Sequence, residues 1–265
     1  MQGKYGVLLP FATDERAPSL DAAIDDLVRV AVYPLHHVEL WTECNEDQRT
    51  IERTKQVLGE YGLHCTIHAP FVDFTLASAD ESVAQACARR LQQTISLAEQ
   101  LNAQSIAIHP GSIAAYESRK EVMRRFADRL EIVRQKSGTT IPLAIENLRP
   151  KHRGVQRTLL DAEAAFASLV EVYPNAQVTL DIGHALQAGM DILAAARTYR
   201  PHLGAVHLHD IDPYSMRSHR AVGSGVLERH TVRELLDIVQ GVPVTIEVLT
   251  PDDLQRSMDY LGNLE

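Results

Sequence analysis

The sequence predicts an α/β protein in which one domain, residues 1–265, forms a closed (β/α)8 (TIM) barrel. Three observations favour this fold. Short runs of β-branched and aliphatic residues recur eight times, segments with helical spacing lie between them, and no linker or change of composition interrupts the series. The length also suits a single barrel, which typically needs about 250 residues.

The expected strands are short and rich in valine, isoleucine and leucine. In chain order they cover residues 6–11, 37–41, 65–69, 105–109, 142–146, 177–181, 205–209 and 243–247. Strands that alternate with helices in this way are joined by right-handed βαβ connections and form a parallel sheet.

The expected helices have apolar residues at helical spacing. They cover residues 20–32, 46–61, 81–101, 119–136, 161–172, 191–199, 228–239 and 252–261. An open, doubly wound sheet is the alternative fold. It is disfavoured because Pro10 and Phe11, and not a glycine-rich dinucleotide loop, follow the first strand.

Composition excludes several classes of function. The formal net charge of −9 argues against a broad nucleic-acid-binding surface. No apolar stretch is long enough to span a bilayer and the start lacks a signal-peptide pattern, so we expect a cytoplasmic protein without a membrane partner. The three cysteines, Cys44, Cys65 and Cys87, are scattered and form no CxxC pair, which favours reduced thiols.

Side chains that can ligate a metal stand at the carboxyl ends of the expected strands, the active-site face of such a barrel. They are Glu39, His68, His109, Glu146, Asp181 followed by His184, His207 with His209 and Asp210, and Glu247. A lone carboxylate at such a position usually caps the next helix, and a lone histidine is usually structural. Several of them in one pocket would be costly to bury without a cation, so the pattern predicts a metal site.

Nitrogen and oxygen ligands without cysteine favour zinc, manganese or iron over calcium or magnesium. Glu146, Asp181, His207 and Glu247 can surround one ion. His68 and His109 come from neighbouring strands and can hold a second ion, with Glu146 as the bridge. We therefore expect one or two divalent ions, with a third as an alternative.

At these positions the chain resembles the xylose isomerase-like barrel superfamily and, within it, the endonuclease IV branch of apurinic-site nucleases. The motifs are His68-Ala-Pro-Phe71, His109-Pro-Gly-Ser112, Ile145-Glu-Asn147, Leu180-Asp-Ile-Gly-His-Ala185, His207-Leu-His-Asp210, His219 before Gly223-Ser-Gly225, and Ile246-Glu-Val248. The resemblance implies metal-ligand roles for His68, His109, Glu146, Asp181, His184, His207, His219 and Glu247.

One position departs from the nuclease pattern, which has an aspartate two residues before His219. Here that residue is Arg217. Because a guanidinium cannot ligate a cation and repels it, a third ion at His184 and His219 lacks one of its expected ligands.

The sugar isomerases and epimerases of the same superfamily resemble the chain through a smaller set, Glu146, Asp181, His207 and Glu247 around one ion. In that branch the two glutamates exchange a proton at a carbon next to a carbonyl. A histidine that matches His184 and a nearby arginine bind the sugar oxygens, and Arg217 suits the role of this arginine. The strand end at Glu39 also resembles the isomerase and epimerase branch, whereas His68 and His109 resemble the ligand positions of the nuclease branch.

Basic residues follow two of the strand ends, so we expect a small anionic substrate, with nucleic acid possible but not favoured. Predicted substrate-binding residues are Arg149, Lys151, Arg217, Arg220 and His209. The turn Gly223-Ser-Gly225 adds backbone N–H groups that can cradle an anion.

Two functions stay open, both with Glu146 and Glu247 as catalytic residues. The first is a two-metal phosphoesterase, a hydrolase in which a metal-activated water attacks a small phosphodiester. The second is a one-metal isomerase or epimerase of a sugar or sugar phosphate. A barrel that binds metal without catalysis is less consistent with so complete a set of ligands.

Overall fold

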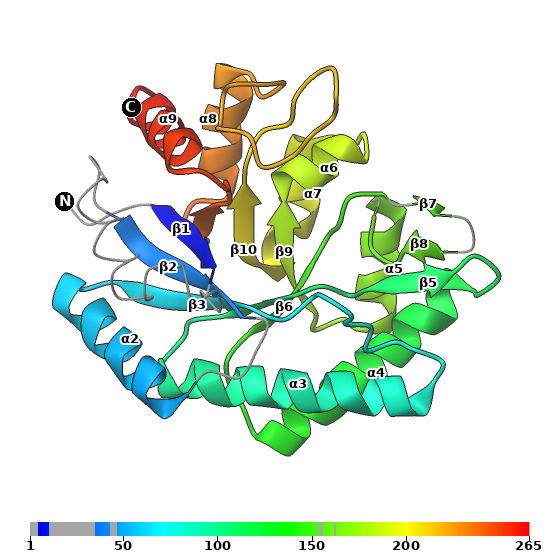
Figure 1. Ribbon diagram of the computed structural model, residues 1–265. Helices are drawn as coiled ribbons and strands as arrows, with labels where there is room; N and C mark the ends of the chain where they lie inside the picture. Colours follow the sequence, from blue (N-terminus) through cyan, green and yellow to red (C-terminus); the bar gives the residue numbers. More distant parts are fainter. Residues whose placement is uncertain are drawn as a thin grey trace.

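The computed structural model describes residues 5–10, 35–42, 47–150, 152–153, 156–161 and 163–264. Its centre is a closed barrel of parallel strands, in which β1 pairs with both β2 and β11 (Figure 1). The barrel strands are β1 (Tyr5–Pro10), β2 (Leu35–Trp41), β3 (His64–His68), β4 (Ile106–Ile108), β6 (Leu143–Glu146), β9 (Gln177–Asp181), β10 (Leu203–Leu208) and β11 (Val244–Ile246). These are the eight predicted runs in their predicted order, so the (β/α)8 fold is confirmed.

The helices lie around the outside of the strands (Figure 1). They are α2 (Gln48–Tyr61), α3 (Glu81–Gln100), α4 (Arg119–Ser137), α5 (Glu163–Val172), α6 (Ile182–Gln187), α7 (Ile192–Tyr199), α8 (Arg229–Ile238) and α9 (Pro251–Gly262), with the 3-10 turn η1 (Arg200–His202) before β10. All but α6 and η1 were predicted at these places. The helix predicted at 20–32 lies outside the described residues.

Polar side chains begin several of these helices. The Asp47, Asp80 and Asp191 carboxylates each accept hydrogen bonds from backbone N–H groups in the first turn of α2, α3 and α7. Such caps satisfy donors that have no partner within the helix, so they define where each helix starts.

A small antiparallel sheet was not predicted from the sequence. It consists of β5 (Ser112–Ala114), β8 (Gln156–Thr158) and β7 (His152–Arg153), in that order, and belongs to the loops that follow β4 and β6. Strands of two or three residues are too short to show a recognisable alternation of polar and apolar side chains.

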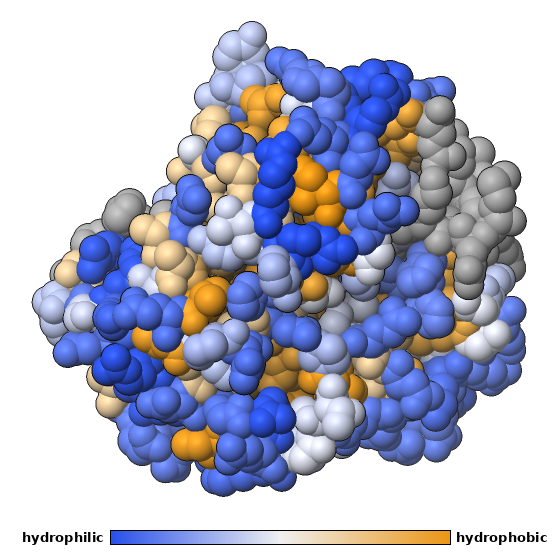
Figure 2. Space-filling model, turned by 180° about the vertical axis from the view of Figure 1, so that it is seen from behind, coloured by the Kyte–Doolittle hydropathy of each residue, from blue (hydrophilic) through white to orange (hydrophobic). Residues whose placement is uncertain are grey.

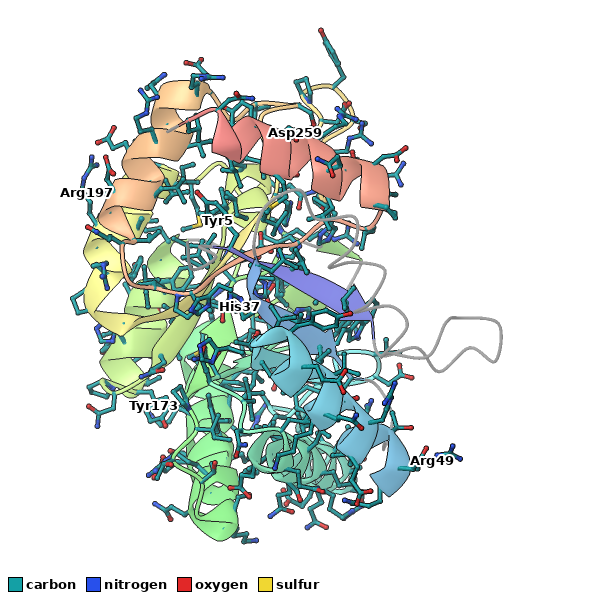
Figure 3. The ribbon with its side chains drawn as sticks, turned by 90° about the vertical axis from the view of Figure 1, so that its left-hand side faces the viewer. Tyr5, His37, Arg49, Tyr173, Arg197 and Asp259 are labelled. Carbon is teal, nitrogen blue, oxygen red and sulfur yellow. The ribbon has the colours of Figure 1, made fainter. Side chains whose placement is uncertain are left out.

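The interior of the barrel contains a polar layer. The side chain of His37 on β2 is fully buried among the strands, and its Nε2 lies 2.9 Å from Thr245 Oγ1 (Figure 3). Burial lowers the pKa of His37 to about 4, so this ring is neutral at physiological pH. The interior of the barrel thus contains hydrogen-bonded polar groups between the strands, in addition to those at the strand ends.

Outside the barrel, apolar side chains of the strands and helices pack into one hydrophobic core, which includes the buried Phe126 and Phe166. On the face shown in Figure 2, hydrophobic side chains reach the surface only as separate patches among hydrophilic ones. Of the helices described, none has the length and apolar character that a bilayer span requires.

Candidate metal centre

Neighbouring strands bring the ligand-type side chains together at the carboxyl end of the barrel. His68 ends β3, Glu146 ends β6 and Asp181 ends β9, while His109 and Glu247 follow β4 and β11 directly. His207 on β10 is in register with Asp181 on β9.

Four of these residues form the first group, which is buried. One ligand atom each from Glu146, Asp181, His207 and Glu247 lies within 4.8 Å of every other. Nδ1 of His207 is 3.0 Å from Glu247 Oε2 and 3.5 Å from Glu146 Oε2. This is the set that the sequence predicts around one ion.

Glu146 also belongs to a second group, with His68 and His109. The Nε2 atoms of the two histidines lie 3.4 and 3.5 Å from Glu146 Oε2. Nδ1 of His68 is 3.0 Å from the Ala69 carbonyl oxygen, to which it can donate its proton, so that Nε2, on the side of Glu146, is the nitrogen available to a metal ion. The structure therefore brings together both predicted groups, with Glu146 shared.

The polar atoms at the centre of the first group fit a cation. Both oxygens of Glu146, Oε2 of Glu247 and Nδ1 of His207 are buried, and within the described part of the chain none has a hydrogen-bond partner of good geometry. Buried polar atoms are normally satisfied, and unpaired buried carboxylates are costly. Imidazole and carboxylate donors suit zinc, manganese or iron.

The same crowding shifts the ionisation of the ligands. Burial alone would raise the pKa of Glu146, but His109 and His207 hold it well below its ordinary value. Burial alone would lower the pKa of His68, but the nearby Glu146 carboxylate raises it to about 9. Burial would likewise lower the pKa of His184, but Asp181 and Glu146 raise it to about 9. Without metal, protons on the imidazoles thus balance the ionised carboxylates.

Metal binding is therefore expected to strengthen as the pH rises. Below about pH 9 the ring of His68, a member of the second group, holds a proton that a ligated ion must displace, so affinity should rise about tenfold per pH unit for each proton released. Zinc affinity measured by chelator competition between about pH 6 and 8, with calorimetry in two buffers to count protons, tests this. A pH-independent affinity would contradict it.

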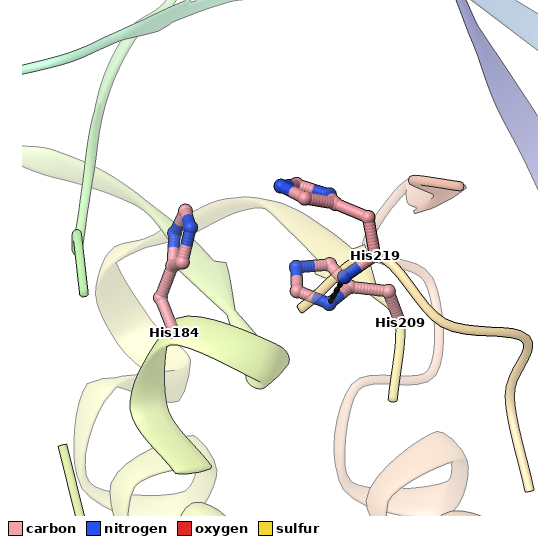
Figure 4. A group of neighbouring side chains, drawn as sticks. All are labelled: His184, His209 and His219. Atoms are coloured by element: carbon pink, nitrogen blue, oxygen red, sulfur yellow. Dashed lines mark hydrogen bonds between the residues drawn. The ribbon is translucent and has the colours of Figure 1, made fainter. Parts of the chain in front are cut away.

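A third group comprises His184, His209 and His219, whose ring nitrogens also lie within 4.8 Å of one another (Figure 4). Nδ1 of His184 is 3.2 Å from the Asn147 carbonyl oxygen, and Nδ1 of His219 is 3.1 Å from that of Glu247. Proton donation to these carbonyls would leave Nε2 of both rings able to bind a ligand. His209, predicted to bind substrate, is instead fully buried in this group.

The basic residues lie on loops at the same end of the barrel. Arg149 follows β6 and is exposed, whereas Arg217 and Arg220 are on the loop between β10 and α8, where Arg217 is exposed and Arg220 half-buried. Lys151 lies outside the described residues.

The loop after β10 is organised differently from the sequence prediction. Of the turn Gly223-Ser-Gly225 that was expected to cradle an external anion, Gly225 N instead binds the buried Asp210 carboxylate and Ser224 N binds the Ala221 carbonyl oxygen. The Asp210 carboxylate accepts from Gly225 N and Val226 N at 2.8 Å and from Leu227 N at 3.2 Å. A Cβ atom on Gly225 would lie 1.9 Å from the Ile211 carbonyl oxygen, so only glycine allows this approach.

Glu39, one of the strand-end residues able to ligate a metal, lies outside the three ligand groups. It is on the far side of His207, with Oε1 2.9 Å from Nε2 and Oε2 accepting from Thr66 Oγ1 at 2.9 Å. An aromatic cluster was not predicted from the sequence. The rings of Trp41, Phe71 and His109 stack in series beside the second group, with centroids 5.0 and 4.8 Å apart. Phe71 ends the motif His68-Ala-Pro-Phe71, the one local signal for this aromatic wall.

Comparison with known proteins identifies the group of barrels that this one resembles. The sequence matches the family described as xylose isomerase-like TIM barrel over residues 30–264. An uncharacterized protein of Methanocaldococcus jannaschii is 27% identical over 242 residues, which cover 85% of this chain and 80% of that relative.

Solved structures of two activities share the fold. An L-ribulose 3-epimerase superposes with a TM-score of 0.78 at 18% identity, covering 99% of this chain and 94% of that one. Endonuclease IV from Thermus thermophilus superposes with a TM-score of 0.74 at 19% identity, covering 98% and 99%. At such identities the likeness establishes the fold alone.

Proposed function

The chain belongs to the xylose isomerase-like TIM-barrel family, and from this premise we propose that it is a divalent-metal-dependent phosphoesterase acting on a small phosphodiester or another small phosphate-bearing substrate. One observation carries the proposal. The His68, His109 and Glu146 group adjoins the Glu146, Asp181, His207 and Glu247 group through a shared carboxylate, which is the arrangement that a pair of ions requires.

The residues of these two groups would hold the metal. A pair of divalent cations supplies Lewis-acid chemistry, because it makes water nucleophilic near neutral pH and neutralises charge on phosphate oxygens. Glu146 would be shared by the two groups, because its Oε2 lies 3.4 to 3.5 Å from His68 and His109 of one group and from His207 of the other. The burial of the carboxylates keeps bulk water from competing with them. Zinc, manganese and iron all suit these donors.

Substrate binding is assigned to the basic loops at the mouth of the barrel. Arg149, Lys151, Arg217 and Arg220 are the candidates, because guanidinium and ammonium groups bind phosphate through charge-assisted hydrogen bonds. The net charge of −9 favours a small anion over a long nucleic acid. Nucleic acid is the less favoured substrate, supported by the likeness of the fold to endonuclease IV.

A one-metal isomerase or epimerase is the alternative function. It is favoured by the completeness of the first group, which needs neither His68 nor His109, and by the likeness to L-ribulose 3-epimerase. In that case Glu146 and Glu247 would act as the acid/base pair.

Metal counting combined with the variant His109→Ala separates the two functions. We expect about two ions per chain in protein loaded with zinc or manganese, hydrolysis of bis(p-nitrophenyl) phosphate, and loss of one ion and most of this hydrolysis in His109→Ala. One ion per chain, no phosphodiester hydrolysis and epimerisation of ketoses that survives in His109→Ala would overturn the proposal.

A further inference from the structure

His209, which directly follows β10, is fully buried, and each of its ring nitrogens has a hydrogen-bond partner. Nε2 lies 3.1 Å from Asp181 Oδ2, and Nδ1 lies 3.0 Å from the backbone nitrogen of His219 (Figure 4). The side chain thus connects a carboxylate of the first ligand group to the loop between β10 and α8.

These contacts determine where the ring carries its proton. The His219 N–H can only donate, so Nδ1 of His209 must accept and a neutral ring has its proton on Nε2. The Asp210 carbonyl oxygen, which would favour the opposite tautomer, is farther away, at 3.3 Å. Nε2–H therefore donates to Asp181, and its lone pair is not available to a metal ion.

Asp181 is held at both of its carboxylate oxygens. Its Oδ1 accepts the His184 N–H at 2.6 Å, as the N-cap of α6. Its Oδ2 accepts from His209 at 3.1 Å and also lies 3.2 Å from Nδ1 of His184. With both oxygens fixed, the carboxylate can turn neither away from Glu146 nor away from His207.

The surrounding backbone is built around this ring. A Cβ atom on Gly183 would lie 1.9 Å from Cε1 of His209, so the glycine in Leu180-Asp-Ile-Gly-His-Ala185 makes room for the imidazole. His219 has a φ of +58°, in the left-handed region that a residue with a side chain rarely adopts, and its N–H points at Nδ1 in this conformation.

We propose that His209 is a positioning residue, neither a metal ligand nor a substrate contact, which orients Asp181 for the ion of the first group and ties the His219 loop to it. The inference rests on the proposed function only for the statement that Asp181 binds metal. Partners of this kind, which hydrogen-bond a metal ligand, typically change metal affinity about 10- to 100-fold when removed.

Two substitutions of His209 test the donor role. His209→Phe keeps an aromatic ring of similar shape but removes both hydrogen bonds, whereas the amide of His209→Gln can still donate to Asp181. His202→Phe is the matched control, because His202 lies on η1 before β10 and its Nδ1 contacts the Ala176 carbonyl oxygen, away from the ligand groups. The number and affinity of zinc sites are measured by competition with a chromophoric chelator.

We expect His209→Phe to weaken one zinc site about 10- to 100-fold without changing the number of sites, His209→Gln to recover most of that affinity, and His202→Phe to match the wild type. Loss of a whole ion in His209→Phe would show that His209 is a metal ligand and would overturn the proposal. A zinc affinity of His209→Phe within threefold of wild type would overturn it too. So would a His209→Gln protein that binds zinc no better than His209→Phe.

A second measurement does not depend on metal. In the metal-free protein, a two-bond ¹H–¹⁵N spectrum should show the Nε2–H tautomer of His209, with Nδ1 as the acceptor. The opposite tautomer overturns the inference even if zinc binds. Failure of the wild type to bind zinc, in contrast, would contradict the proposed function, and the tautomer would still decide the role of His209.

Discussion

Glu146→Gln is expected to abolish most activity and to lower the metal content of both ligand groups. Glutamine has nearly the same shape as glutamate but lacks the charge that His68, His109 and His207 surround. The loss of one electrostatic group from a preorganised site typically costs about 10²–10³-fold in rate. Because Glu146 is shared, the loss here should lie at or above the upper end of that range.

The fold should survive this change, because the amide fills the same buried space and can donate to neighbouring imidazole nitrogens. Elemental analysis, circular dichroism and kcat/KM on the identified substrate are the measurements. The control is Arg217→Ala, which removes an exposed charge outside the ligand groups. It should keep the wild-type metal content and lower kcat/KM only. A folded Glu146→Gln protein with near-wild-type turnover would show that Glu146 is not catalytic.

Asp210→Ala is expected to lower the free energy of unfolding substantially, and by more than Asp212→Ala on the same loop. The fully buried carboxylate accepts from four backbone N–H groups, those of Ile211, Gly225, Val226 and Leu227. A buried donor left without an acceptor costs about 1–3 kcal/mol, and water entering the space left by the side chain would satisfy part of the set. We expect a net loss of roughly 3 kcal/mol, which corresponds to a fall in Tm of about 6–12 °C for a chain of this size.

Thermal and urea unfolding of metal-free protein measure this effect without the contribution of bound ions. Asp212→Ala is the matched control, because Asp212 lies on the same loop and accepts from Tyr214 N and Ser215 N in a local turn near the surface. It should lose much less stability. Equal losses in the two variants would show that the Asp210 carboxylate does not hold the loop together.

Much of the candidate site follows from the position of residues along the chain. Strand ends in a parallel barrel lie on one face, so His68, Glu146 and Asp181 had to lie at the same end of the barrel once eight strands were recognised. The pairing of His68 and His109 with Glu146 also follows from the order of neighbouring strands. These are consequences of local periodicity, which a sequence displays directly.

The different roles of His207 and His209 could not be obtained in this way. His207 lies on β10 and His209 directly follows this strand, two positions further on, a spacing at which side chains of an extended chain share a face. Only their neighbours from other strands distinguish them, since His207 lies against Glu146 and Glu247, whereas His209 lies against Asp181 and the His219 backbone. The sequence alone suggested substrate binding for His209, and its burial points elsewhere.

By itself, the sequence determined the barrel, the face on which its candidate site lies and the residues that could ligate metal there, because these depend on periodicity and strand order. Tertiary structure alone decided which hydrogen bonds those residues make. Asp210 binds the N–H groups near Gly225, and His209 holds Asp181, through contacts between segments distant in the chain. Such contacts depend on how loops and rings are placed relative to one another in the fold, and no local sequence pattern predicts this placement.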